Sequence, residues 1–416
     1  MTRAEIEAEL LAWMCSPWNA PGAGEGGAPG AGDVASRVGD ASATDDARFE
    51  RIALALFRFQ LAHCTPYANL CRSIGRTPDV VTRSDEVPAV PTGAFKEFDL
   101  RCFPAEDTIR TFRTSGTSTQ RRGQLHLDTL AVYEASLLST LRALFLTDLV
   151  GRRPLMRFLA PSPEEAPDSS LTHMFATLAE AEGAAGSGFD WTDGRLDVSG
   201  LADAIEAARS RRQPLVLGGT SFAFVHWLDA TRGDRAERWT LPPGSRVMET
   251  GGFKGRSREV PREILRREIA ERFGLAEERV VNQYGMTELG SQFYDSTLVD
   301  PAGPRRKLGP PWVRIRLVDP ATGERAAPGE PGLVVIHDLA NTGSVAAIET
   351  ADLARPIPAR PGGLPGATGR DGFDLLGRAD GAEARGCSIA ADVMLGDAAA
   401  GRRGGESDGA VGETGR

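Results

Sequence analysis

The spacing of apolar residues changes several times along the chain, and each change predicts a different element. Residues 4–14 and 47–61 place apolar side chains every three or four positions, which is typical of amphipathic helices. Between them, residues 20–46 are rich in Gly, Ala, Asp and Pro, and this composition predicts a disordered linker. Residues 396–416 are mostly Gly, Ala, Arg and acidic residues, which predicts a disordered tail.

From residue 105 onward, short apolar runs alternate with longer helical stretches. The predicted strands are Leu155–Leu159, Leu215–Gly218, Arg246–Glu249, Val280–Gln283, Val313–Val318 and Leu333–His337, and the predicted helices are Thr129–Phe145, Leu201–Ala208 and Pro261–Phe273. Such alternation favours an α/β fold in which much of the sheet is parallel and helices flank it.

Composition narrows the function classes. The 416 residues include 48 Lys+Arg and 57 Asp+Glu, for a net charge of −9, which argues against non-specific binding to nucleic acid or to an anionic membrane. The five cysteines form no CxxC pair and are too scattered for a disulfide scaffold or a zinc cluster. No secretory signal and no apolar run near 18 residues is found, so the expected location is the cytoplasm.

A hydroxyl-rich loop is the first candidate for chemistry. Residues 114–119 read TSGTST, with five hydroxyl residues around Gly116. The hydroxyls and backbone amides of such a loop can surround a phosphate. The loop is not a Walker A motif, because no GxxxxGK[ST] pattern is present. A Ser/Thr-rich surface turn remains the alternative.

The second candidate, NQYGMTE at 282–288, follows an apolar run and therefore stands at the carboxyl end of a predicted strand. Open α/β sheets bind ligands at that end. The ring of Tyr284, the small Gly285, the hydroxyl of Thr287 and the carboxylate of Glu288 suit a nucleotide with its Mg²⁺. The alternative is a helix start capped by Thr287.

Two further groups complete the set. Gly251 and Gly252 follow a predicted strand and would let the backbone approach a flat ring, although such a pair also marks ordinary tight turns. Lys254, one of three lysines in the chain, follows directly. Asp352 and Arg378 can pair with two ribose hydroxyls, and a structural ion pair would explain the same residue types.

In this order, the four groups resemble the adenylate-forming superfamily of acyl-CoA ligases, adenylation domains and firefly-type luciferases. From about residue 50 to about residue 395, the chain resembles the acyl-protein synthetase (LuxE) family more closely. The strings that carry this resemblance are VPAVPTGAFKEF, TSGTS, GTSFAFVHWLD, METGGFKGRSREVP, NQYGMTELGSQFYD, HDLANTGS and GRADGAEARGCSIAADVML. That family supplies activated fatty acid to the aldehyde-producing reductase of bacterial luminescence.

The resemblance implies an acid–thiol ligase that makes acyl-AMP from ATP and a carboxylic acid, and that then passes the acyl group to its own cysteine and on to a partner reductase. The implied positions are Thr114, Ser115, Gly116 and Thr117 for the phosphates, Gly251, Gly252, Tyr284 and Gly285 for the base, Thr287 for the α-phosphate, Glu288 for Mg²⁺, Asp352 and Arg378 for the ribose, and Cys387 for the acyl group.

The acyl pocket is expected beside the helix that contains Phe222, Phe224 and His226, because aromatic side chains suit an alkyl or aryl carboxylate. A partly buried imidazole with satisfied hydrogen bonds is the alternative for His226. An inert buried thiol is the alternative for Cys387, whose neighbour Arg385 would lower the pKa of a reactive thiol.

The chain departs from the superfamily pattern in two places. The phosphate loop continues without the usual Lys, so Arg121 or Arg122 would have to supply the charge. Only 38 residues follow Arg378, where most of the superfamily carries a further small domain with a catalytic Lys, so this domain is expected to be missing or truncated. Lys254 is then a candidate for the missing charge near the phosphates.

The expected organisation has four parts. An N-terminal helix and linker occupy 1–48, the acyl-activating domain 49–377, a hinge segment with the candidate acyl-acceptor cysteine 378–395, and a tail 396–416. Two other functions fit the same residues. One is a ligase that delivers the acyl group to coenzyme A or to a carrier-protein thiol, and the other is a non-catalytic nucleotide-binding scaffold. The sequence does not identify the acid, nor does it show that the pathway is luminescence.

Overall fold

The computed structural model describes residues 1–16, 18, 31–115, 121–232, 239–251, 258–359, 370–379 and 394, and gives only the backbone for 31–43. Its helices are α1 (Arg3–Cys15), α2 (Ala31–His63), α3 (Thr65–Ser73), α4 (Ala94–Glu97), α5 (Ala131–Leu144), α6 (Ser170–Glu182), α7 (Val198–Arg211), α8 (Ser221–Ala230) and α9 (Arg262–Phe273). Short 3₁₀ turns lie at Ser84–Glu86, Ala105–Asp107, Glu277–Arg279 and Ser296–Leu298.

The strands are β1 (Val90–Pro91), β2 (Arg110–Arg113), β3 (Gln124–Leu127), β4 (Leu155–Pro161), β5 (Gly188–Thr192), β6 (Arg195–Leu196), β7 (Leu215–Thr220), β8 (Arg246–Thr250), β9 (Val280–Tyr284), β10 (Phe293–Asp295), β11 (Lys307–Leu308), β12 (Val313–Val318), β13 (Gly332–Asp338), β14 (Ala347–Ile357) and β15 (Gly372–Arg378). Strands β2 and β3 form a separate hairpin. The others form one sheet, in the order β12-β13-β14-β15-β11-β10-β9-β8-β7-β4-β5-β6, with β1 beside β14.

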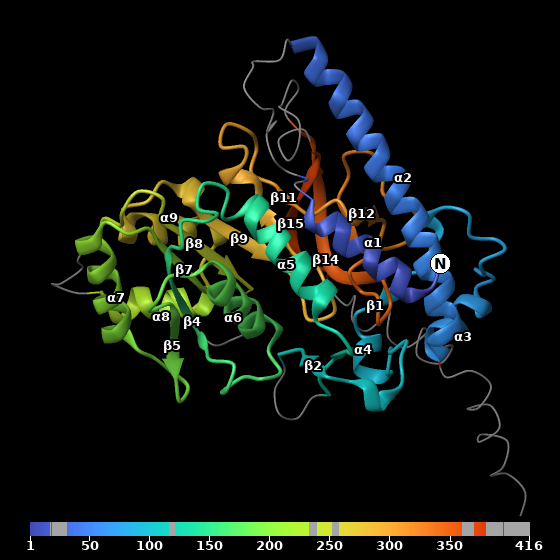
Figure 1. Cartoon of the computed structure of the whole chain (residues 1–416), viewed down its shortest axis with the longest axis horizontal. Helices are drawn as coiled ribbons and strands as arrows, with labels where there is room; N and C mark the ends of the chain where they lie inside the picture. The colour runs from blue at the N-terminus through green and yellow to red at the C-terminus, as the bar shows by residue number, and fades with distance from the viewer. Residues whose placement is uncertain are drawn as a thin grey trace, which may run out of the picture.

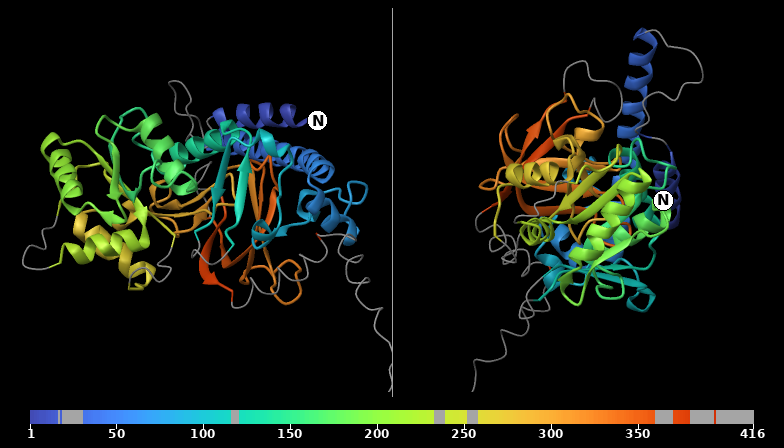
Figure 2. Two further views of the ribbon diagram at one scale, coloured as in Figure 1. Left: turned by 90° about the horizontal axis from the view of Figure 1, so that it is seen from below. Right: turned by 90° about the vertical axis from the view of Figure 1, so that its left-hand side faces the viewer.

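The sheet has a parallel half and an antiparallel half, which lie side by side along the long axis of the molecule (Figures 1 and 2). Strands β5, β4, β7, β8 and β9 are parallel, and helices α6 to α9 belong to this half. Neighbours in the order from β9 to β12 are antiparallel, and β1 pairs with β14 in parallel. Helices α1, α2 and α3 lie over the antiparallel half (Figure 1).

Alternating side chains of the parallel strands enter two different cores. Leu215 and Leu217 of β7 pack in the cluster with α7, α8 and α9, whereas Val216 between them joins the large cluster that contains Phe175 of α6. Successive residues of a strand point to opposite faces, so a strand covered on both faces has consecutive apolar residues. This explains the short apolar runs in these strands, such as residues 215–217 of β7.

The structure confirms the predicted α/β class, with a mixed sheet flanked by helices, and contains an element at each predicted strand and helix. The predicted linker over 20–46 is wrong for residues 31–46, which belong to α2. The low hydrophobicity of that stretch weakens the local signal for a helix, but its Ala residues and absence of Pro are compatible with one. The predicted tail lies outside the described residues. Among the helices described, none is long and apolar enough to span a membrane.

Candidate active site

Three residues predicted to bind a nucleoside lie together, on β9, β14 and β15. Tyr284 ends β9, and its hydroxyl donates a hydrogen bond to Asp352 Oδ2 of β14 at 2.8 Å. Burial and the nearby Asp352 carboxylate raise the pKa of Tyr284 well above its usual value, so the hydroxyl stays protonated and remains a donor. The ring is held by Phe293 and Phe373, each with its centroid 5.9 Å away.

Arg378 is brought to the same place by an irregularity in the sheet. Asp352 and Arg378 are register partners of β14 and β15, and the register shifts between Leu353 and Ala354. Opposite Leu353 stands Gly377, with φ +128°, a conformation that favours glycine. The bulge leaves Arg378 Nε 3.8 Å from Asp352 Oδ1, with 68% of its side chain exposed. An exposed guanidinium beside a carboxylate can still contact a ligand.

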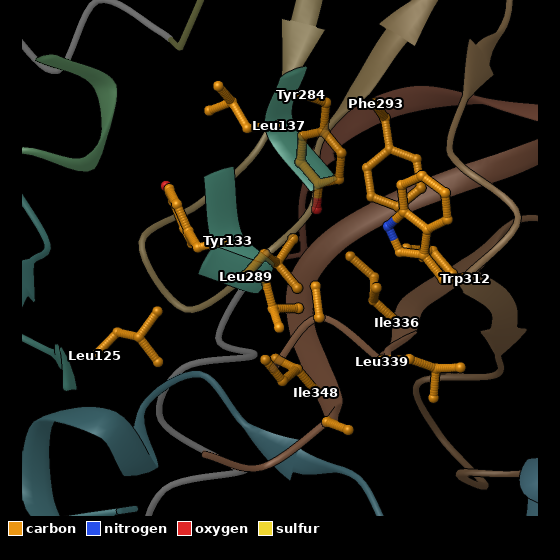
Figure 3. Close-up of a cluster of buried hydrophobic side chains, with 14 of the residues drawn as sticks. Leu125, Tyr133, Leu137, Tyr284, Leu289, Phe293, Trp312, Ile336, Leu339 and Ile348 are labelled. Carbon is orange, nitrogen blue, oxygen red and sulfur yellow. The ribbon is translucent and has the colours of Figure 1, made fainter. Parts of the chain in front are cut away.

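The segment after Tyr284 is a turn and not the helix start that was the alternative prediction. Residues 285–292 connect β9 to the antiparallel β10, and Leu289 N donates to Met286 O at 3.2 Å. Gly285 and Thr287 are half-buried, whereas Glu288 is buried. Leu289 and Tyr284 pack into one apolar cluster with Leu137, Ile336 and Leu339 (Figure 3). The polar residues of this turn are therefore held next to a packed apolar cluster.

Thr114, from the hydroxyl-rich loop, lies next to Glu288. Gly123 at the end of the loop donates its N–H to Thr114 Oγ1 at 2.9 Å, and Thr114 N donates to Gly123 O at 2.9 Å. A methyl group built on Gly123 would lie 3.4 Å from Glu288 Oε1 and 3.5 Å from Thr114 Oγ1. The same methyl group would lie 3.1 Å from Thr114 Cγ2, so Gly123 packs closely between the Thr114 side chain and the Glu288 carboxylate, and we call these three residues the cradle. Ser115 is exposed beside it.

The base of this loop is fastened by Arg122. Its Nε donates to Thr114 O at 2.5 Å and its Nη1 to Asp168 Oδ2 at 2.9 Å, while Arg113 N donates to Asp168 O at 2.9 Å. Arg121 pairs with Glu97 at 3.2 Å on the surface. Sequence reasoning offered both arginines as phosphate charges and missed Asp168, which lies in a loop with no motif around it.

The turn after β8 is stabilised by the buried carboxylate of Glu249. Gly251 adopts φ +75°, and its carbonyl lies 3.0 Å from the Ser221 hydroxyl at the start of α8. Glu249 accepts hydrogen bonds from Ser221 and from the side-chain amide of Asn282. Burial raises the pKa of Glu249. These contacts join the ends of β8 and β9, at the carboxyl edge where the predicted base-binding residues Gly251 and Tyr284 stand.

The three residues predicted to line the acyl pocket do not lie together. Phe222 and His226 form an edge-on group with Trp191 of β5, with centroids 5.6–6.2 Å apart, and His226 is exposed. Phe224 points instead into the core between α8 and the sheet, where it is fully buried. Helical geometry separates Phe224 from the other two, since only residues three or four apart share a face. Trp191 was missed.

Four predicted residues lie outside the described part of the chain, namely Gly116, Thr117, Gly252 and Lys254, and so does Cys387. The geometry therefore brings together Thr114 with Glu288, and Tyr284 with Asp352 and Arg378.

The chain is similar to known ligases in sequence and in fold. A curated protein from Aliivibrio fischeri, the long-chain-fatty-acid–luciferin-component ligase, is 21% identical over 343 residues, which cover 82% of this chain and 86% of that protein. A crystal structure of 2-hydroxyisobutyryl-CoA ligase in complex with 2-HIB-AMP aligns with a TM-score of 0.58 at 16% identity, over 80% of this chain and 68% of that one.

A second structure of the same ligase, in complex with 2-HIB-AMP and CoA, gives a TM-score of 0.57 at 18% identity, over 87% of this chain and 75% of that one. At such identities the likeness concerns the fold, which is that of the adenylate-forming ligases. The sequence profile described as acyl-protein synthetase, LuxE, matches residues 40–395. These findings confirm the predicted class of enzyme, an acid–thiol ligase, and the chain belongs to the acyl-protein synthetase family LuxE.

Proposed function

We propose that this protein uses ATP to convert a long-chain fatty acid to an acyl adenylate and then transfers the acyl group to a thiol. The observation that carries the proposal is that Tyr284, Asp352 and Arg378 lie together, and that Glu288, in the turn directly after Tyr284, borders the cradle with Thr114. The first group suits a nucleoside and the second suits a phosphate chain. The fatty-acid substrate is proposed from the name of the Aliivibrio fischeri relative.

The nucleoside would be held by the half-buried carboxylate of Asp352. Because Tyr284 already donates to one of its oxygens, the carboxylate is oriented before any ligand arrives. Its remaining lone pairs would accept hydrogen bonds from the two ribose hydroxyls, with Arg378 beside them. Gly251 would contribute the backbone edge against the adenine, together with Gly252.

The phosphates and Mg²⁺ would lie over Gly123. Mg²⁺ prefers hard oxygen ligands. The Glu288 carboxylate and the Thr114 hydroxyl are such ligands, and they lie 3.4 Å and 3.5 Å from the position of a methyl group built on Gly123. Bound there, Mg²⁺ would neutralise phosphate charge. Thr287 and Ser115 would donate hydrogen bonds to phosphate oxygens, and Gly116 and Thr117 complete the proposed loop. We propose Lys254 as a further positive charge near the phosphates.

The first step is a displacement at phosphorus. A carboxylate oxygen of the fatty acid attacks the α-phosphorus, the bond from that phosphorus to the bridging oxygen breaks, and pyrophosphate leaves with the electron pair. The step needs alignment and charge neutralisation, and it needs no general base, since the attacking carboxylate is already ionised.

The second step would use Cys387. Its thiolate attacks the acyl carbon, the bond between that carbon and the AMP oxygen breaks, AMP leaves, and the thiol proton passes to solvent. A partner reductase would then receive the acyl group. Phe222 and His226, with Trp191, offer an aromatic surface for the acyl chain, and Phe224 supports the helix from below.

The test of the first step is carboxylate-dependent exchange of labelled pyrophosphate into ATP, across fatty acids of increasing chain length, short acids and aromatic acids. Exchange with long-chain acids is expected. Exchange confined to short or aromatic acids would contradict the substrate class, and no exchange despite measurable ATP binding would favour a nucleotide-binding scaffold. Lys254→Met should reduce exchange strongly, and near-normal exchange would contradict its proposed role.

The acceptor is tested separately. Incubation with ATP and a labelled fatty acid should leave a thioester on the denatured protein that Cys387→Ser abolishes and Cys15→Ser, at an exposed cysteine, retains. Label that never stays on the protein, but appears on coenzyme A when this is added, would identify the enzyme as an acyl-CoA ligase.

A further inference from the structure

The turn that contains Glu288 is hydrogen-bonded to the turn after β13. Asn341 is 2% exposed, and its side-chain Nδ2 donates to Glu288 O at 2.8 Å and to Val345 O at 3.2 Å. These residues are 53 positions apart in the chain. The string HDLANTGS, which contains Asn341, had no role in the predictions beyond the family resemblance.

A second set of hydrogen bonds joins the same two turns at Ser291, three residues after Glu288. The fully buried carboxylate of Asp338 accepts hydrogen bonds from Ser291 N at 2.8 Å and from Ser291 Oγ at 2.7 Å. It also accepts one from Ala340 N at 3.0 Å. Asp338 and Asn341 together therefore fix both Glu288 and Ser291 relative to one strand end. We call these two residues the 338–341 clamp.

The space between clamp and turn is filled. A methyl group on Gly290 would lie 2.9 Å from Ala340 Cβ and 3.0 Å from Asn341 Oδ1, distances that would force the two segments apart. Gly290 is not in a left-handed conformation, so its small size is required for close approach and not for backbone freedom. The turn therefore has no room to move toward the clamp.

The clamp is itself held by helix α2. The buried Gln60 donates through Nε2 to Asn341 O at 2.9 Å, and its Oε1 accepts from Ala346 N at 3.1 Å. Both ends of its amide are thus used on the loop that contains Asn341. A buried amide with both ends satisfied is costly to displace, so it makes a firm support.

We propose that Asn341 is a positioning residue, which fixes the Glu288 backbone so that the carboxylate faces the cradle at Gly123. The inference rests on the proposed function, since it assigns Glu288 to Mg²⁺ and the phosphates. Asn341 acts on Glu288 directly, because its side chain donates to the backbone carbonyl of Glu288 and the carboxylate of the same residue borders the cradle. A displacement of about 1 Å at such a group is enough to lower a rate by about 100-fold.

The test compares Asn341→Ala with Thr297→Val. Thr297 is also buried, and its hydroxyl donates to the carbonyl of Glu278 at 2.7 Å, just before β9 and at the opposite end of that strand from the site. Thr297→Val loses one hydrogen bond to a backbone carbonyl, and Asn341→Ala loses two. Isothermal titration calorimetry would give the affinities for ATP with Mg²⁺ and for AMP, and urea unfolding would give the stability of each variant.

Asn341→Ala should weaken binding of ATP with Mg²⁺ by about tenfold or more, raise the Mg²⁺ concentration needed for half-maximal exchange, and leave AMP affinity within about twofold. Thr297→Val should lose stability without this selectivity. Equal losses for ATP and AMP in Asn341→Ala, or no loss in either, would overturn the positioning role.

Gly290→Ala provides a second route, because its methyl group pushes the turn away from the clamp while every hydrogen-bonding side chain stays in place. It should show the same selective loss, and a folded Gly290→Ala protein with wild-type affinity for ATP would contradict the inference. Wild-type protein that lacks carboxylate-dependent exchange would refute the proposed function, whereas wild-type exchange with unaffected variants would refute the positioning role alone.

Discussion

The turn at 285–292 and the base of the loop at 114–123 border the same cradle, but they are held in different ways. The turn is anchored by buried groups, namely Asn341 on Glu288 and Asp338 on Ser291. The loop base is anchored by Arg122, with 35% of its side chain exposed, and by Asp168, with 27% exposed. Buried hydrogen bonds are expensive to break, whereas exposed ion pairs are easily replaced by water.

The difference suggests a division of roles within the site. A carboxylate that must meet a metal and a developing charge benefits from a rigid support, because misplacement costs rate. In the proposed function the loop admits and releases a phosphate chain, and a less buried support would allow its base to shift. The following experiments test whether the two anchors differ as much in energy as they do in burial.

The largest expected effect is on activity, at Glu288. Glu288→Gln keeps the shape of the side chain but removes its charge, so carboxylate-dependent ATP–pyrophosphate exchange should fall by about 100-fold or more. The exposed Glu278→Gln is the control and should retain exchange. Exchange by Glu288→Gln within about threefold of wild type would show that the rigid turn does not carry an essential charge.

The second effect is on stability and its pH dependence. Burial raises the pKa of Asp338 to about 6, from 3.8 in a free chain. Because the folded-state pKa is the higher one, the stability contributed by this group is present below pH 3.8 and is lost as pH rises through 6. Between pH 4 and pH 7, wild type should therefore lose about 2 kcal/mol relative to Asp338→Asn.

Urea unfolding of both proteins across that pH range measures this difference. The surface variant Asp79→Asn accounts for the loss of one charge. If the difference in unfolding free energy between Asp338→Asn and wild type stays constant with pH, burial does not raise the pKa of Asp338.

A smaller effect is expected at Tyr284. Tyr284→Phe removes the hydrogen bond to Asp352, so the free energy of unfolding should fall by about 1–2 kcal/mol and AMP affinity should fall several-fold. Tyr67→Phe is a matched control, since the buried Tyr67 hydroxyl donates to Pro88 O at 2.8 Å far from these residues in the chain. Equal AMP affinities for the two variants would argue against a role of Tyr284 in orienting Asp352.

The smallest effect is expected at the loop base. Arg122→Ala should cost about 0.5 kcal/mol of stability, and a double-mutant cycle with Asp168→Ala should give a coupling energy below about 1 kcal/mol. A coupling above about 2 kcal/mol would place this half-buried pair on a level with the buried clamp and would remove the contrast between the two anchors.

Local pattern was sufficient for much of the fold. The strands of the parallel half place apolar residues on both faces because both faces are covered, and their short apolar runs marked the positions of β4, β7, β8 and β9. The linker prediction failed over 31–46, because a stretch of Ala, Asp and Gly has no apolar stripe although it forms part of α2. The antiparallel register of β10 to β15 was likewise absent from the local signal.

The residue types of the candidate site can be recognised from the chain alone, since TSGTS, YGMTE, Asp352 and Arg378 occur in the order of an adenylate-forming enzyme. The contacts that support these residues follow from the packing of distant segments. Arg122 meets Asp168 across 46 positions and Asn341 meets Glu288 across 53, and the bulge at Gly377 sets Arg378 beside Asp352. Periodicity reports which face of an element is buried. It does not report which distant polar group will lie opposite, because that is set by how the strands and helices pack.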